Sequence, residues 1–492
     1  MDARRTPVVV SAGQATEREE TLGAVEVAAH AAEIAFEPCP GLRGRIERVT
    51  MVSVVFSPVS SRPGSELATR LGLEGTACET TSPGGNLPQW LVTRAAREIR
   101  DGKLGATLIA GGEATRSMQA ANPDAHFMRR PRPDAEAKGA DPVVGPSLSG
   151  AIGAAEIGIR LFQPTDVYAL FEAARAHASG RTFDEQRAFL GPLMAHFSSV
   201  AAEHPNAWFR EALSPDQIAK VADDNRLIAE PYPKRMNAFP HVDQGAAVVV
   251  TSLATARELG LEDRCAFVWS GADTMETTPA TRPDLSDAPA MRHAARATLD
   301  AAGIGADELT WIDLYSCFPI AVQVGADGLG VALDDSRGLT ITGGLPFFGG
   351  PGNDYSLHAI ATLADRLRES GGLGYVGANG GMLSKHSMGI YGATPPPRGF
   401  VAADTAAAQA EVDAAALPVA TEAEGTADVA AATVAYERDG RVGSAPVIAA
   451  LEDGRRIAAR ADDSIRESLA GVSLVGRRIR VSGSPPTYVV ES

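Results

Sequence analysis

The sequence predicts an α/β protein built from two duplicated βαβαβ-type halves, followed by a small β-barrel module. Predicted strands alternate with predicted helices, which is typical of a mostly parallel, layered sheet. The turn Gly84-Gly85-Asn86 recurs as Gly350-Pro351-Gly352-Asn353, and Ala110-Gly111-Gly112 recurs as Ala378-Asn379-Gly380-Gly381. Asn86 and Ala110 are 24 positions apart, and Asn353 and Ala378 are 25 apart. Matched turns at matched spacing indicate an internal duplication.

The first half is predicted to cover residues 1–255. Its strands are expected at 6–13, 48–56, 106–110 and 243–251, and its helices at 23–36 and 65–71. An insertion at about 115–236 interrupts it, with a polar, charged stretch at 124–141 and helical patterns at 168–177, 184–203 and 214–228. An excursion of this length usually covers a pocket or builds an interface.

The second half is predicted to cover residues 256–405. Its strands are expected at 265–271, 309–317 and 373–376, and its helices at 288–302 and 355–369. Residues 406–431 are rich in Ala, Glu, Asp and Thr, which predicts a linker with room for one helix.

The remaining residues, 432–492, are predicted to form the barrel module. Strands are expected at 432–437, 447–451, 456–461, 477–481 and 488–491, with a helix at 463–470. Three strands, a helix and two strands is the order of an OB-type barrel. The module has nine Arg and eight acidic residues, so it lacks the basic excess of a nucleic-acid binder. A docking or lid role, with a protein as a further partner, is favoured.

Composition narrows the class of protein. The chain has 492 residues and a net charge of −16, which argues against a broad nucleic-acid footprint. Its four Cys form no CxxC pair and no disulfide framework, which predicts a reducing, cytoplasmic setting. No run of eighteen apolar residues occurs, so no membrane span is expected.

The helix that follows Gly84 and Gly85 is the most informative local feature. It is expected to begin at Asn86, with Pro88 in its first turn, where a missing backbone N–H costs nothing. A helix N-terminus entered through glycines lets a ligand approach closely and presents unpaired N–H groups. Such positions hold anions or activate nucleophiles, yet none of these residues offers a nucleophilic side chain.

Five segments carry a family resemblance in combination. They are Ala110-Gly111-Gly112-Glu113, Asp243-Gln244-Gly245-Ala246-Ala247, Tyr315-Ser316-Cys317-Phe318, Gly344-Leu345-Pro346 and Gly377-Ala378-Asn379-Gly380-Gly381-Met382. With the duplication, they resemble the thiolase superfamily over about residues 5–400, above all the sterol-carrier-type thiolases often labelled acetyl-CoA acetyltransferases. The resemblance implies a layered α-β-α-β-α fold, acyltransferase chemistry on CoA thioesters and a place in lipid metabolism. The module resembles the small extra domain of one thiolase-like subgroup.

The resemblance also shows what is missing. Thiolase chemistry needs a nucleophilic Cys, a second Cys as acid and base, and a His and an Asn-held water as oxyanion donors. These positions fall at Gly85, at Gly377 or Ala378, at Leu345 and at Tyr315, which cannot replace them. Removing one oxyanion donor typically costs about 10²–10³ in rate, and removing a nucleophile costs more. Ordinary thiolysis or Claisen condensation is therefore not expected.

Three residues remain as substitute catalytic candidates: Tyr315, Cys317 and His386. Cys317 and His386 are expected to be either a replacement nucleophile and base or a buried thiol and a hydrogen-bonded loop His. The residues expected to line a ligand site are Gly84, Gly85, Asn86, Leu345, Phe347, Phe348, Gly352, Asn353, Asn379 and Gly380.

Three functions follow from this pattern. The leading hypothesis is a protein that binds CoA, acyl-CoA or another acyl ligand without the thiolase reaction. The second is an acyltransferase or lyase that uses substitute residues or a partner chain. The third is a scaffold that carries the module. No cofactor or metal is expected, and both a monomer and a homodimer remain open.

Overall fold

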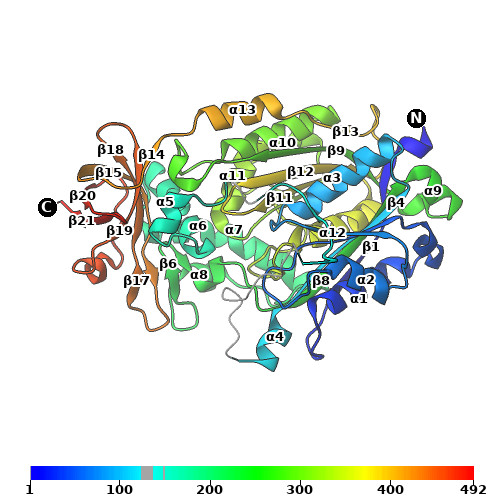
Figure 1. The fold of residues 1–492 in the computed structure, drawn as a ribbon, viewed down its shortest axis with the longest axis horizontal. Coiled ribbons are helices and arrows are strands. Elements are labelled where there is room, and N and C mark those ends of the chain that lie inside the picture. The colour runs from blue at the N-terminus through cyan, green and yellow to red at the C-terminus, as the bar shows by residue number, and fades with distance from the viewer. Residues whose placement is uncertain (1, 124–136, 148–149, 492) are drawn as a thin grey trace.

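The computed structural model describes residues 2–123, 137–147 and 150–491 (Figure 1). Residues 124–136 of the polar stretch expected in the insertion lie outside these ranges. No helix in the described part of the chain is long and apolar enough to cross a membrane. The chain forms a layered α/β body, and the C-terminal barrel lies at one end of the molecule against the insertion (Figure 1).

The described residues include an 11-stranded sheet with the order β10-β11-β12-β9-β1-β8-β4-β2-β3-β5, in which β13 also pairs with β9. The first half contributes β1 (Pro7–Thr16), β2 (Arg48–Met51), β3 (Ala77–Thr81), β4 (Ala106–Ala114), β5 (Val143–Val144) and β8 (Asp243–Ser252). The second half contributes β9 (Ala266–Met275), β10 (Trp311–Leu314), β11 (Leu373–Gly380), β12 (Lys385–Gly392) and β13 (Val401–Ala402).

The strand order confirms the duplication. From the centre outward, β1-β8-β4-β2 and β9-β12-β11-β10 follow the same plan. In each half the first two neighbouring pairs are antiparallel and the third is parallel. The halves join through β1 and β9, where Val8 lies opposite Phe267 and Val9 opposite Ala266. The two β layers of the α-β-α-β-α arrangement are therefore linked into one sheet through this short β1–β9 pairing.

The helices complete the five predicted layers. The central layer holds α3 (Leu87–Arg100) and α12 (Tyr355–Ser370), which contact strands of both halves. Their apolar faces, which include Leu91 and Ile360, share one core with the inner faces of the strands. The outer layers hold α1 (Ala24–Phe36) and α2 (Pro63–Arg70) over the first half, and α10 (Pro289–Ala302) and α11 (Pro319–Leu329) over the second.

The insertion is mostly helical. It contains α4 (Thr115–Ala121), α5 (Ala154–Gly158), α6 (Pro164–Ala178), α7 (Phe183–Glu203), α8 (Pro215–Ala219), β6 (Leu227–Ala229) and β7 (Tyr232–Pro233). The helix expected at 214–228 is wrong beyond Ala219. Asn225 Nδ2 donates to the carbonyls of Ile218 and Lys220, both at 2.9 Å, and this side-chain bonding replaces a helical turn.

The C-terminal module is a closed five-stranded barrel, with β14 (Val419–Ala420) added beside β19. Its strands are β15 (Gly425–Ala432), β18 (Pro446–Leu451), β19 (Arg456–Ala461), β20 (Arg478–Ser482) and β21 (Thr487–Val490). It closes through the parallel pair β19–β21, which confirms the OB-like barrel.

The first barrel strand, β15, lies inside the segment predicted to be a linker. The prediction missed it because β15 is built mostly from small residues, which resemble a low-complexity linker in the sequence. The linker helix is α13 (Ala406–Ala414). The helix expected at 463–470 is a short 3₁₀ turn, η8 (Arg466–Leu469).

The module packs closely on the insertion. The hairpin of β16 (Ala435–Tyr436) and β17 (Val442–Ser444) joins β6 and β7 in a four-stranded sheet. At this junction Glu230 N donates to Val434 O at 2.9 Å, and Tyr436 Oη donates to Glu230 Oε1 at 3.1 Å. Ala173 of α6 and Phe183 of α7 belong to the barrel's apolar core. The module therefore shares its core with the insertion.

Most expected strands and helices are confirmed to within a few residues, but α11 and β12 were not anticipated. The remaining short elements are α9 (Leu253–Glu258), η1 (Ala3–Arg5), η2 (Pro40–Arg45), η4 (Lys234–Met236), η5 (Glu262–Arg264), η6 (Pro279–Thr281) and η7 (Ala306–Glu308).

Candidate functional site

The glycine turns of the two halves meet at the N-termini of α3 and α12. Gly84 N donates to Asn353 Oδ1 at 3.0 Å, and Ser356 Oγ donates to Gly85 O at 2.7 Å. Asn86 precedes α3 and its Nδ2 donates to Ser387 Oγ at 3.2 Å. The duplicated glycine turns are therefore in direct contact. This contact is expected when the two halves face each other across the central layer.

The space beside Gly85 is filled. A Cβ atom placed on Gly85 would lie 2.3 Å from Tyr315 Oη and 2.6 Å from the carbonyl oxygen of Asn379. Tyr315 is held from its far side by Tyr355, whose ring meets it edge-on with centroids 5.4 Å apart. The position expected for a nucleophile thus lacks a reactive side chain and also lacks room for one.

The four degenerate motifs lie together. Tyr315 N donates to Gly377 O at 3.0 Å, which joins the Tyr315 segment to the Gly377 segment. Ser316 Oγ accepts from Leu345 N at 3.3 Å, which joins the Tyr315 segment to the Leu345 segment. With Tyr315 against Gly85, these contacts link all four motif positions into one site.

The segment around Leu345 is packed with aromatic rings. Leu345 is buried, and its carbonyl accepts from Phe239 N at 3.1 Å. Phe348 is 0% exposed and meets the rings of Tyr355 and His358 edge-on. Phe347 is also buried, and its carbonyl accepts from Phe209 N at 3.1 Å. Apolar packing therefore surrounds Leu345, the position at which the thiolase pattern has an oxyanion-donating His.

Two other expected ligand positions are equally close-packed. Gly352 has φ +56°, and a Cβ atom there would lie 2.5 Å from Glu113 Oε1. Gly380 lies against the α3 turn, since its Cβ would be 2.9 Å from Gly85 N. The backbone of Gly85 therefore packs against the end of β11.

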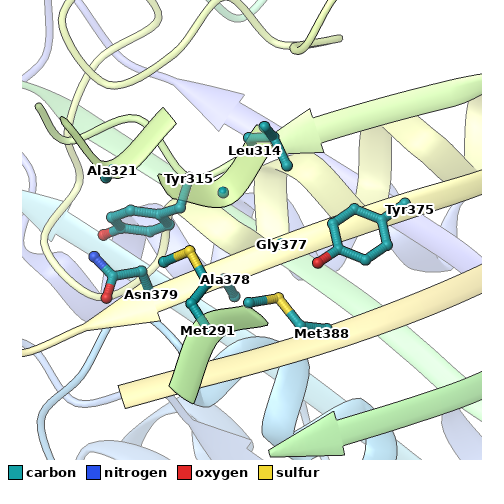
Figure 2. Close-up of a pocket in the computed structure, with 10 residues that line it drawn as sticks. Met291, Leu314, Tyr315, Ala321, Tyr375, Gly377, Ala378, Asn379 and Met388 are labelled. Carbon is teal, nitrogen blue, oxygen red and sulfur yellow. The ribbon is translucent and has the colours of Figure 1, made fainter. Parts of the chain in front are cut away.

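A small cavity lies behind Tyr315 (Figure 2). Its volume is about 10 Å³, which is room for about one water molecule. Tyr315 and Asn379 lie at one side of it, Tyr375 lies at the other, and Met291 and Met388 lie between them, as Figure 2 shows. In this closed arrangement the cavity has no room for an acyl chain.

Cys317 and His386 are both buried near Asn379 but do not form an activated pair. Asn379 Nδ2 lies 3.9 Å from Cys317 Sγ, and Asn379 pairs with His386 across β11 and β12. Neither ring nitrogen of His386 has a hydrogen-bond partner among the described residues. Burial raises the pKa of Cys317 to about 12, and burial with the nearby Arg282 charge lowers the pKa of His386 to about 3. The thiol is protonated and the imidazole is neutral at pH 7.

Two further residues belong to this site, although no sequence motif marks them as site residues. Tyr168 reaches in from α6 and accepts from Asn379 Nδ2 and from Leu383 N, both at 2.9 Å. Arg282 is 2% exposed and donates through Nη2 to Met382 O at 2.9 Å, while its Nη1 has no partner among the described residues. Both side chains hold the β11–β12 turn, and they were missed because they lie far from that turn in the sequence.

The buried His386 makes stability pH-dependent. Its folded pKa of about 3 lies below the ordinary 6.5, so its contribution is fully present above pH 6.5 and is lost as the pH falls toward 3. One pKa unit is worth about 1.4 kcal/mol, so near pH 5 the loss is about 2 kcal/mol. We expect His386→Gln to unfold in urea with a correspondingly flatter pH dependence. Equal pH slopes for the two proteins would contradict this assignment.

No group of three or more His, Cys, Asp or Glu side chains within the described ranges could hold a metal ion. The layered fold and the filled centre together define a thiolase-like protein. The chain matches the solved structure of a monomeric SCP2-thiolase-like protein type 1 (STLP1) from Mycobacterium smegmatis, with 32% identity, 100% coverage of both chains and a TM-score of 0.85. This chain belongs to that family of SCP2-thiolase-like proteins.

Two more distant structures share the fold. The Ltp2–ChsH2(DUF35) aldolase is 17% identical, with a TM-score of 0.59, over 79% of this chain and 98% of that chain. The Acat5 thiolase from Ascaris suum, solved in complex with coenzyme A, is 16% identical, with a TM-score of 0.56, over 79% of this chain and 99% of that chain. No protein-family model and no curated protein sequence matches the chain.

Proposed function

We propose that the protein binds CoA or an acyl-CoA thioester without carrying out the ordinary thiolase reaction. The observation that carries this proposal is the contact between Gly85 and Tyr315. A Cβ atom on Gly85 would lie 2.3 Å from Tyr315 Oη, so the centre cannot form an acyl-enzyme there. Leu345 supplies no side-chain hydrogen-bond donor where thiolase chemistry needs one.

Two features support CoA thioesters as the ligand class. The fold is shared with a thiolase that was solved in complex with coenzyme A. The N-termini of α3 and α12 meet at Gly84 and Asn353, and helix N-termini favour the carbonyl oxygen of a thioester or a carboxylate. Because the cavity beside Tyr315 measures about 10 Å³, binding at the centre requires Tyr315 to move.

Titration calorimetry with CoA and acyl-CoA esters, together with a thiolysis assay, tests this function. We expect binding in the micromolar to millimolar range and no thiolysis above the uncatalysed rate. Leu345→His is a matched variant, because it restores the missing side chain and leaves Gly85 unchanged. It is expected to remain inactive, since the nucleophile is still absent. Absence of binding at millimolar ligand would refute the proposal, as would thiolysis by the unaltered protein.

A lyase is the second candidate, supported by the fold neighbour described as an aldolase. Aldol cleavage needs a general acid or base and no acyl-enzyme, so the loss of a nucleophile at Gly85 does not exclude it. Tyr315, Cys317 and His386 are its substitute residues, and a partner chain could complete the site. Cleavage of a β-hydroxyacyl-CoA that is lost in Tyr315→Phe would favour this reading over ligand binding alone.

A scaffold role through the C-terminal module is the third candidate. It gains support if no acyl ligand binds and the module captures a partner. Light scattering would also decide between a monomer, as described for the Mycobacterium smegmatis relative, and a homodimer.

A further inference from the structure

Lys385 is a buried amine at the first position of β12. Its side chain is 0% exposed. Nζ donates one hydrogen bond, at 2.6 Å, to the carbonyl oxygen of Pro83. Burial alone lowers the pKa of Lys385 to about 8, with no contribution from a neighbouring charge. A buried ammonium is normally paired with a carboxylate, so this amine is unusual.

The amine lies at the N-terminal turn of α3, next to the degenerate nucleophile position. A Cβ atom on Gly84 would lie 2.8 Å from Lys385 Nζ and 2.6 Å from Asn86 Oδ1. Asn86 Oδ1 is itself buried and has no hydrogen-bond partner among the described residues. Gly380, which pairs with Lys385 across β11 and β12, lies against Gly85. The Lys385 amine and the unpartnered Asn86 Oδ1 therefore lie together beside Gly85, the position that corresponds to the thiolase nucleophile.

The choice of Lys at this position is informative. The chain contains 40 Arg and only five Lys, and the other four lysines, Lys103, Lys138, Lys220 and Lys234, are exposed. Arg could also donate to the Pro83 carbonyl, but it stays protonated at every accessible pH. Only a Lys can become a neutral amine near neutral pH and act as a nucleophile.

We propose that Lys385 accepts an acyl group from a CoA thioester held at the N-terminus of α3. The proposal rests on the proposed function. Neutral Nζ attacks the thioester carbonyl carbon, the C–N bond forms as the C–S bond breaks, and the amine proton passes to the departing CoA thiolate. The products are an amide on Lys385 and free CoA thiol. The positive end of α3 stabilises the oxyanion formed on the way.

Incubation with acetyl-CoA, followed by intact-mass analysis and peptide mapping, tests the proposal. Lys385 is expected to be acylated about ten-fold faster than any of the four exposed lysines, because a thioester bound at the N-terminus of α3 is held beside its Nζ. The adduct should resist hydroxylamine, which removes a thioester from Cys317 but leaves an amide. Lys385→Arg keeps the charge and should lose this adduct, while Lys103→Arg should keep it. Circular dichroism checks that both variants are folded.

A small thioester, acetyl-N-acetylcysteamine, and calorimetry with CoA separate this proposal from the function on which it rests. Labelling of Lys385 by the small thioester without CoA binding would refute CoA recognition and leave the amine chemistry standing. CoA binding with no adduct on Lys385 from either thioester would overturn the present proposal. Labelling of Lys385 at the rate of the exposed lysines would also overturn it.

Discussion

Gly85→Ala is expected to destabilise the folded protein by about 3 kcal/mol, the upper part of the usual range for overpacking a core. The new Cβ atom would lie 2.3 Å from Tyr315 Oη and 2.6 Å from the carbonyl oxygen of Asn379. Tyr315 is buried against Tyr355, and Asn379 O belongs to the backbone of β11, so neither can withdraw without moving the core. Urea unfolding monitored by circular dichroism measures the change.

Two further variants test whether crowding at Gly85 causes this loss of stability. Gly85→Ala combined with Tyr315→Phe should recover only part of the loss, because the phenol oxygen is removed while the Asn379 carbonyl stays. Gly44→Ala is the matched control, since a Cβ atom there meets nothing within 4 Å, and its effect should lie within about 0.5 kcal/mol. Equal stability of Gly85→Ala and Gly44→Ala would show that the centre is more open than described. Gly85→Cys should likewise fail to create thiolysis.

Glu230→Ala is expected to cost about 3 kcal/mol, the lower end of the range for a broken buried ion pair, because it leaves the largely buried Arg187 with only the exposed carboxylate of Asp184 as an ion-pair partner. Arg187 Nη1 donates to Glu230 Oε2 at 3.0 Å, and the side chains are 12% and 4% exposed. Tyr436 of the barrel hairpin donates to the other oxygen of the same carboxylate. One substitution thus loosens the insertion and the barrel together. Thermal unfolding of the full chain measures the loss.

The same junction predicts how the module unfolds. Calorimetry should show one transition that includes the barrel, and removal of residues 416–492 should destabilise the remainder by exposing Ala173 and Phe183. Glu452→Ala is the matched control for Glu230→Ala. This barrel carboxylate is 74% exposed, so its removal should change the stability little. Two separate transitions, or a truncated chain as stable as the full one, would show that the module folds independently.

The duplication could be predicted because the features that indicate it lie within short segments of the sequence. Glycine turns and the spacing of Asn86 to Ala110 constrain backbone geometry within a few residues, and the strand order confirms it. The start of the barrel was missed because β15 is built from small residues whose alternation is visible only once its neighbours bury one face. The end of α8 depends on Asn225, which forms its hydrogen bonds only after the chain turns back.

Some properties of the site also follow from the sequence, and others depend on the tertiary structure. The proposal that the thiolase reaction is absent rests on the residue types at Gly85 and Leu345, because a side chain that lacks a thiol or an imidazole lacks it in any fold. The roles of Tyr168, Arg282 and Lys385 could not be predicted. Each acts on a segment 100 or more positions away, and such contacts are set by packing.

By itself, the sequence determined the duplicated fold and the residue types at Gly85 and Leu345, since both depend on residue identity and spacing along the chain. Only the tertiary structure decided that the vacated centre is filled. Tyr315 packs against Gly85, and Phe348 packs against Tyr355. Whether a lost side chain leaves a cavity or a close-packed core depends on how distant segments meet within a few tenths of an ångström. No local pattern encodes that distance.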